Sequence, residues 1–163
     1  MRLVRLAIRV LLLLIGAVLG AAIASAAAAA IMRPRLQDST QPDDDAIDVA
    51  SVYGSREFRS TADAFAGGRV ICWYSGVDVD LRGATLGPAG GELEVWTVFG
   101  GTRIRVPEDW AVELHGVAVF GGATNTAARP DAAADGPLLL IRHRTIFGGF
   151  AVAAEPDDEV LAV

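Results

Sequence analysis

The distribution of hydrophobic and polar residues divides the chain into two unlike parts. The 23 residues from Val10 to Met32 contain no charged side chain, and most are Leu, Ile, Val, Ala or Gly. About 20 apolar residues are enough for a helix to cross the hydrocarbon core of a bilayer. A helix is expected there because it satisfies its own backbone hydrogen bonds in lipid. We therefore predict one transmembrane helix over residues 10–32, within an N-terminal membrane anchor of residues 1–35.

A cleaved signal peptide is the alternative interpretation of the same segment. Three arginines precede the apolar run, and residues 24–26 (Ala-Ser-Ala) would form an acceptable cleavage site. The run continues beyond that site to Met32, and two further arginines follow it, as at a membrane boundary. An uncleaved anchor is therefore favoured. The slightly larger positive charge before the run favours the N-terminus inside and the following domain outside the bacterial cytoplasmic membrane, with the reversed topology as the alternative.

Periodicity of two residues characterises the region that begins at residue 67. Val77, Val79 and Leu81, for example, alternate with Asp78 and Asp80. Such alternation indicates strands with one face toward the core and one toward water. We predict an all-β domain over residues 67–154. Residues 36–50 are acidic and predicted to be a flexible linker, residues 51–66 are either a short helix or an irregular lead-in, and residues 155–163 form an acidic tail.

A short motif, an aromatic residue followed by a small residue and glycine, recurs within this domain. Its intervals are 25, 21 and 27 residues, and such periods indicate stacked units that each bury only part of their surface alone. Phe65-Ala66-Gly67-Gly68 is a candidate degenerate first copy. The four clear copies are Tyr74-Ser75-Gly76, Phe99-Gly100-Gly101, Phe120-Gly121-Gly122 and Phe147-Gly148-Gly149.

Alignment of the copies on the aromatic residue predicts what each column of residues does. The glycines would permit a sharp bend that a side chain would forbid, and the aromatic residue would be buried and hold the bend. Two further columns are expected to join a continuous apolar core: Trp73, Val98, Val119 and Ile146, one residue before the aromatic, and Leu93, Leu114 and Ile141, six before it. The pattern fits a β-solenoid, with an antiparallel β-sandwich as the alternative.

The same alignment predicts charge pairs between neighbouring copies. Asp78 and Asp80 fall in the columns that hold Arg103 and Arg105 in the next copy. Stacking in register would oppose them as exposed pairs on one face, each contributing about 0.2–1 kcal/mol.

Charge excludes one class of partner. All 20 acidic residues and nine of the 14 basic residues follow Arg35, which gives that part of the chain a charge of −11. Nucleic acid would be repelled by so acidic a domain.

The residues that could carry chemistry do not form a recognisable catalytic or metal-binding pattern. Cys72, the single cysteine, lies in an apolar run and is expected to be a buried, inert thiol. His115 and His143 would need further donors, of which Glu113 and Cys72 are the candidates, to hold a metal. We therefore predict no catalytic, cofactor-binding or metal-binding residues, and no enzyme activity.

Contacts with a partner are more plausible than catalysis. Trp96 lies on the same face of its strand as Glu92 and Glu94, and this face should point outward. An exposed tryptophan on a strand face is a candidate protein-contact residue. Arg142 and Arg144 form a small basic cluster in the acidic domain and are further candidate contacts.

The repeat also resembles a known family. Phe99–Trp110 (FGGTRIRVPEDW) resembles the FGG-strand-VPE element of the LiaF-type C-terminal domain, or toastrack domain, of cell-wall-active-antibiotic and envelope-stress response proteins. Tyr74–Ala84 resembles another rung of that domain, and the copies at Phe120 and Phe147 fit later ones. The match covers roughly residues 65–153. It departs from the pattern in its single predicted membrane span and in the less regular residues 123–126.

The resemblance implies a short right-handed β-solenoid and a non-catalytic role beside a membrane signalling protein. We therefore expect a membrane-anchored β-repeat interaction module that binds an unidentified membrane or envelope protein and modulates envelope-stress signalling. The alternative is a structural envelope protein that self-associates end to end through its open rungs.

Overall fold

The computed structural model describes residues 40–127 and 137–155, together with Arg9 and Gly16, whose backbone is helical. The chain separates into two compact units, residues 1–35 and residues 36–163. The predicted membrane span falls in the first unit and, except for Gly16, outside the described residues, as does the acidic tail beyond Glu155. Within what is described, no helix is long and apolar enough to cross a bilayer.

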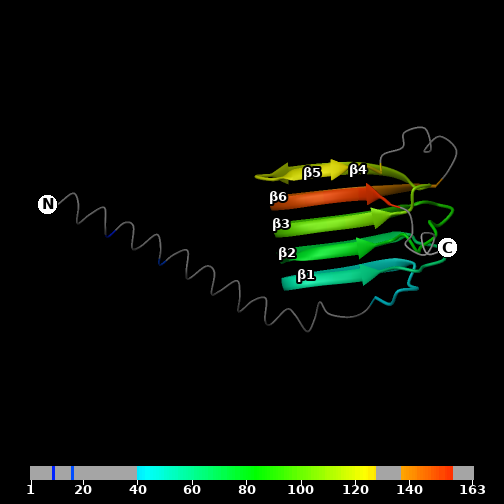
Figure 1. Cartoon of the computed structure of the whole chain (residues 1–163), viewed down its shortest axis with the longest axis horizontal. Coiled ribbons are helices and arrows are strands. Elements are labelled where there is room, and N and C mark those ends of the chain that lie inside the picture. The colour runs from blue at the N-terminus through cyan, green and yellow to red at the C-terminus, as the bar shows by residue number, and fades with distance from the viewer. Residues whose placement is uncertain (1–8, 10–15, 17–39, 128–136, 156–163) are drawn as a thin grey trace. The chain divides into compact units, whose positions relative to one another are not determined.

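The second unit is an all-β, β-solenoid-like domain (Figure 1). All of its strand pairs are parallel, so the alternative of an antiparallel sandwich is wrong. The strands are β1 (Ala46–Arg59), β2 (Gly67–Asp80), β3 (Gly91–Val106), β4 (Ala111–Val119), β5 (Gly122–Asn125) and β6 (Leu138–Ala154).

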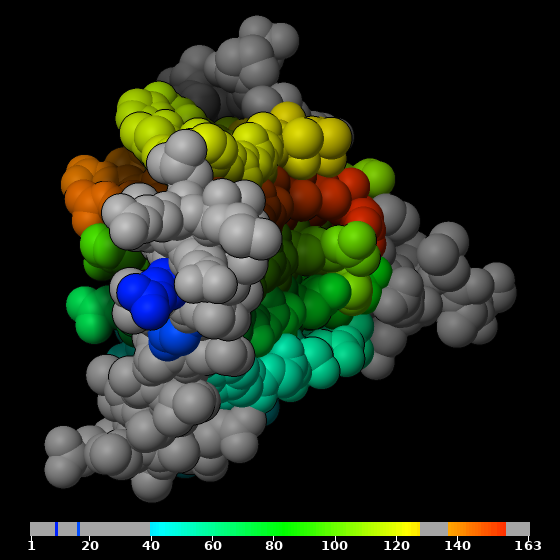
Figure 2. Space-filling model, turned by 90° about the vertical axis from the view of Figure 1, so that its left-hand side faces the viewer, coloured from blue at the N-terminus to red at the C-terminus, as the bar shows by residue number. Residues whose placement is uncertain are grey.

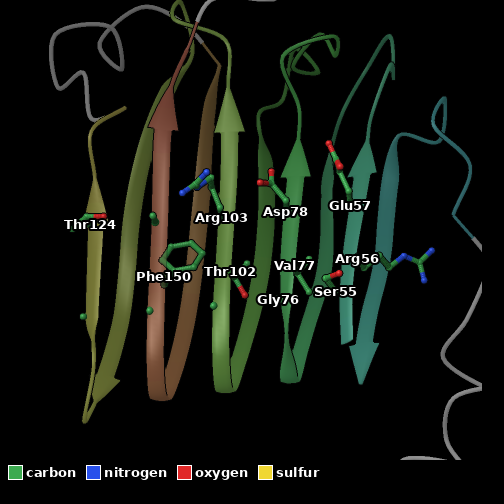
Figure 3. Close-up of a pocket in the computed structure, with 14 residues that line it drawn as sticks. Ser55, Arg56, Glu57, Gly76, Val77, Asp78, Thr102, Arg103, Thr124 and Phe150 are labelled. Carbon is green, nitrogen blue, oxygen red and sulfur yellow. The ribbon is translucent and has the colours of Figure 1, made fainter. Parts of the chain in front are cut away.

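Each unit of the stack, which we call a rung, bends back on itself at one aromatic residue. The part before the bend is the first arm and the part after it is the second arm; Figure 3 shows the arms forming two layers. β1, β2, β3 and β6 each form a whole rung, whereas β4 and β5 share one. We call the end of the domain where the five bends lie the tip, and the opposite end, where the loops connect the rungs, the loop end.

The rungs do not stack in the order of the sequence. β6 pairs with β3 on one side and with β4 and β5 on the other. Figure 2 shows the orange-to-red rung of β6 between the green and the yellow rungs. The last two repeats are therefore stacked in the reverse of their order along the chain. The physical reason lies in their composition: β6 is long and apolar on its inner face, whereas residues 122–126 suit the end of a stack, where only one neighbour must be satisfied.

The domain begins earlier than the sequence indicated. Ala46–Arg59 is a strand, so the predicted linker cannot extend to residue 50, and the ambiguous residues 51–66 contain the second arm of β1. Ile47 and Val49 are buried in the core. The run of acidic residues before them obscured a strand whose apolar side chains alternate only over a few positions.

The core lies between the two arms. Leu93 and Ile141 are fully buried and Leu114 packs against them, as the column six residues before each aromatic predicted. Next to the bend the interior is polar: Thr97 and Thr102 share a hydrogen bond of 2.7 Å between their hydroxyls across the two arms. Cys72 is buried in the same strip and its thiol donates to the Ser75 carbonyl at 3.0 Å.

The loop end is closed by large side chains. Phe65 is fully buried, its ring centroid lies 5.9 Å from that of Trp110, and its backbone bridges to Leu86. Phe65 is therefore not the first copy of the repeat. That copy is Tyr53-Gly54-Ser55, which aligns with Tyr74 and lies 21 residues before it.

Candidate functional site

The tip carries a ladder of five stacked aromatic rings, which we call the aromatic ladder. Neighbouring ring centroids lie 4.7–5.3 Å apart and the planes are tilted by 5–14°. The spacing matches the distance of about 4.8 Å between paired strands, so the stacking follows from the register. From one end of the stack to the other, the ladder consists of Tyr53, Tyr74, Phe99, Phe147 and Phe120.

The aromatic residues themselves make the bend. All five have φ between 49° and 53°, a left-handed conformation that costs about 1–3 kcal/mol for a residue with a large side chain. The glycines were expected to supply this conformation, but in the four copies identified from the sequence they do not. Ring stacking offsets the strain, since each aromatic pair contributes about 0.5–1.5 kcal/mol beyond its buried area.

The ladder is exposed, which contradicts the expectation that its rings are buried. Tyr74 is 39% exposed, Phe147 46% and Phe120 75%. The column just before the ladder is also on the surface instead of in the core, because it lies on the outer face of the first arm. Trp73, Ile146 and Val119 in this column are each more than 40% exposed, and we call the whole set, Val52, Trp73, Val98, Ile146 and Val119, the flanking column.

Phe99, Phe120 and Phe147 are each followed by two glycines, and the two positions have different roles. A Cβ at Gly100, Gly121 or Gly148 would lie 1.9–2.1 Å from a carbonyl oxygen of the neighbouring rung, so the close approach of the bends requires these glycines. The next position is different. A Cβ there would meet no atom of the described chain closer than 4.0 Å, and the φ angles are not left-handed. We call these four residues, Gly76, Gly101, Gly122 and Gly149, the glycine floor.

The glycine floor lies in an open groove of about 680 Å³ on the outer face of the second arms (Figure 3). Beside it lie polar residues of four rungs, Glu57, Asp78, Arg103 and Thr124, which Figure 3 labels. Ala151 of β6 occupies the position between Arg103 and Thr124. One oxygen of Asp78, Oδ1, is buried and accepts no hydrogen bond from a described residue. The groove thus has a floor without side chains and one polar wall.

A second hollow, of about 360 Å³, lies on the outer face of the first arms. It is lined by Trp73 and Trp96 with Ile71 and Val98 between them. Trp96 is 37% exposed and faces outward as expected, and the Arg144 guanidinium lies 4.6 Å from its ring centroid. Arg142 instead pairs with Glu92 at 3.0 Å, so the two arginines do not form one basic patch.

The predicted charge pairs are in register, and one of the two forms, with Arg105 4.0 Å from Asp80. Asp78 lies beside Arg103 and Asp80 beside Arg105 in the sheet. The Asp78 carboxylate nevertheless pairs with Arg105, at 2.6 Å, while Arg103 forms no ion pair with a described residue. The side chain of Arg105 thus contacts both carboxylates, and its shorter contact is the diagonal one to Asp78.

Asp80 is buried and was expected to be exposed. The Arg82 guanidinium donates two hydrogen bonds of 2.9 Å to its carboxylate. These bonds hold the pKa of Asp80 below its ordinary value of 3.8, against the opposing effect of burial. The pair is a buried contact of the loop end, and its bidentate geometry explains how two charges are tolerated there.

The two histidines lie in different environments. His143 is 5% exposed, stacks on Phe150 with centroids 5.1 Å apart, and has its pKa lowered by burial. His115 is on the surface and pairs with Glu113. Within residues 40–127 and 137–155 no group of three or more His, Cys, Asp or Glu is placed to hold a metal ion.

Comparison with known proteins leaves the chain without an assigned family. No family model, no curated protein and no solved structure matches it. The resemblance to the LiaF-type domain therefore still depends on the short motifs of the sequence alone. The tip is the candidate functional site that the geometry itself provides, and exposure of the ladder was the feature that sequence reasoning missed.

Proposed function

We propose that this chain is a non-catalytic interaction module, held at the bacterial cytoplasmic membrane by residues 10–32, that binds a protein partner through its tip. The single observation that carries the proposal is the apolar surface formed by the aromatic ladder and the flanking column over five rungs. Extended exposed apolar surface is uncommon on soluble domains and marks interaction sites.

The glycine floor supports the same conclusion. Glycine weakens a strand by roughly 0.5–1 kcal/mol relative to alanine, and the fold shows no steric need for it at these four positions. A glycine inside a strand often marks a place where another molecule's backbone approaches closely. A flat partner surface lying against the groove would explain why no side chain projects there.

A protein partner fits the tip better than an anionic lipid surface or a sugar. The domain is acidic, with a charge of −11 after residue 35, and acidic surfaces are repelled by anionic headgroups. Sugars stack on open ring faces, but in the ladder each inner ring has a neighbour on both faces. The hollow between Trp73 and Trp96 would receive one anchoring side chain, as in protein interfaces.

The resemblance to LiaF-type domains suggests the biological setting. A partner in the same membrane, acting in the response to envelope stress, is the role we propose. The positive charge before the predicted membrane span supports a position of the domain on the outer side of that membrane. External protease added to intact cells tests this position, because it should then remove a tag fused after Val163.

Site-specific photo-crosslinking in intact cells tests the docking proposal. We expect a photoreactive residue in place of Val98 or Phe147 to give one discrete adduct, and the same residue in place of Glu108, exposed at the loop end, to give none. The substitution Trp73→Ser should abolish the adduct formed from Val98. Equal adducts from the tip and from Glu108, or an adduct insensitive to Trp73→Ser, would refute the proposal.

A further inference from the structure

The two ends of the stack differ in how their edge strands are protected. β1 is the edge at one end, and the chain itself covers part of it. The Thr40 hydroxyl accepts a hydrogen bond of 2.7 Å from the Asp48 amide and donates one of 3.1 Å to the Asp48 carbonyl. Arg56 donates to the carbonyl of Ala50. Backbone groups that an added strand would need are therefore already used.

The rung of β4 and β5 forms the other end. Among the described residues one side chain covers its edge, the Asn125 amide, which donates to the Val112 carbonyl at 3.3 Å near the start of β4. Val117 is 62% exposed, Val119 44% and Phe120 75%. Natural edge strands are usually protected by lysine, proline or inward-pointing charges, and residues 116–126 contain no lysine, proline or charged residue. An apolar edge of this kind is a template for pairing.

The geometry points to a second copy of this chain as the occupant of that edge, forming a closed dimer through the β4–β5 rung. A two-fold axis that runs from the tip along the bisector of the two arms exchanges the arms and keeps tip against tip. It places β4 of one copy over β5 of the other. The two strands run in opposite directions relative to the tip, so they would pair as an antiparallel ladder.

Charge distribution is compatible with this pairing. On β4 the ionisable residues are Glu113 and His115, which already pair with each other. With Phe120 opposite Phe120, His115 and Glu113 would face Asn125 and Ala127 of the second copy, which carry no charge. No like charges are opposed, whereas two copies of the β1 end would bring together Asp48, Glu57 and the arginines beside them.

The aromatic ladder supplies the contact at the centre of the interface. One face of the Phe120 ring stacks on Phe147 with centroids 4.7 Å apart, and no other described ring covers the opposite face. Because Phe120 lies at the bend, the two-fold axis brings it against Phe120 of the second copy. The two ladders would then join into one.

The protected β1 end determines the size of the assembly. If both ends were open, copies could add head to tail into a filament. Because Thr40 and Arg56 occupy the β1 edge, only the β4–β5 ends can pair, and pairing stops at two copies. This inference concerns the end of the stack, and it shares Val119 and Phe120 with the apolar surface of the tip. The measurements below need no docking partner, so failure of the dimer and failure of docking are distinguishable.

The mass of the full chain in detergent, measured by native mass spectrometry, tests the inference. We expect a species of two chains, each of 17.0 kDa. The double substitution Val117→Lys/Val119→Lys should raise the dissociation constant at least tenfold, because lysines on an edge strand oppose pairing. The matched control Ser55→Lys/Glu57→Lys, at exposed positions of β1, should leave the dimer intact.

A crosslink distinguishes this interface from any other dimer. In a Cys72→Ser background, Phe120→Cys should give a disulfide-linked dimer on mild oxidation, and Glu57→Cys should not. The circular dichroism spectra of all variants should keep their β signature, which separates loss of pairing from loss of folding. A monomer at every concentration, assembly beyond two copies, or equal loss of the dimer in the β1 control would overturn the inference.

Discussion

The loop end and the tip use the same kinds of side chain for opposite purposes. At the loop end, Phe65 and Trp110 are 0% and 5% exposed and pack against each other. At the tip, four rings of the aromatic ladder are 39–75% exposed, and neighbouring rings stack on one another. The loop end is therefore stabilised by burial of aromatic side chains in the core, and the tip by stacking of the same kind of side chain from rung to rung.

Backbone conformation separates the two ends as well. The loops at the loop end turn with hydrogen bonds between backbone groups, such as that of 2.8 Å from the Phe65 amide to the Thr85 carbonyl. The tip turns at single residues in the left-handed region, and it has no loop at all. The neighbouring rungs stabilise the strained backbone at the tip, so each bend needs the rungs beside it to keep its conformation.

Removal of one ring from each end should give the largest difference in stability. We expect Phe65→Ala to lower the free energy of unfolding by about 3–5 kcal/mol, since it leaves a cavity in a packed site. Phe147→Ala should cost about 1–3 kcal/mol, because it removes two stacked pairs worth about 0.5–1.5 kcal/mol each. Urea denaturation of the full chain in detergent measures both, and equal costs would contradict the distinction between burial and stacking.

Removal of the buried Asp80–Arg82 ion pair tests how much the loop end contributes to the free energy of unfolding. Asp80→Asn should cost about 3 kcal/mol or more, because the Arg82 guanidinium stays buried without its counter-charge. The matched control Asp78→Asn, at a half-buried site, should cost about 1 kcal/mol or less.

Acid should abolish the contribution of the Asp80–Arg82 pair to the free energy of unfolding. Since the folded pKa of Asp80 lies below 3.8, the pair stabilises fully above pH of about 4 and the stabilisation is lost as the pH falls through the folded pKa. The difference in melting temperature between the parent chain and Asp80→Asn should therefore be full above pH of about 4. It should shrink as the pH falls through the folded pKa of Asp80. Parallel curves across the acid range would show that the carboxylate is not the titrating group.

Neighbouring glycines at the tip should respond with opposite signs. Gly148→Ala would place a Cβ 2.1 Å from the Gly100 carbonyl oxygen, and we expect a loss of about 2–3 kcal/mol. Gly149→Ala meets no described atom within 4 Å and should stabilise the isolated protein by about 0.5–1 kcal/mol. The smaller effect is the more informative, because a gain in stability accompanied by a weaker crosslink at the tip would assign this glycine to binding.

Local features of the sequence were sufficient to locate most of the repeat. Tyr74, Phe99, Phe120 and Phe147 stand at the bends, and the alternation around them gave the inner column of Leu93 and Ile141. Tyr53 was missed because an acidic segment precedes its strand, although its distance of 21 residues from Tyr74 equals one of the other intervals. Phe65 was misassigned because Gly67 and Gly68 follow it.

The sequence by itself indicated the strands after residue 67 and four of the five bends, because a two-residue period and a recurring aromatic motif can be read from consecutive residues. Parallel pairing was one of two alternatives that the sequence left open, and the structure decided between them. Only the tertiary structure decided the order of the rungs, the exposure of the ladder and the partner of each charge. These three features depend on which segments lie side by side. The arrangement of the segments depends in turn on how much apolar surface each one buries against its neighbours. β6 takes the position with two neighbours because it can bury an apolar face, and β4 with β5 is left at the open end.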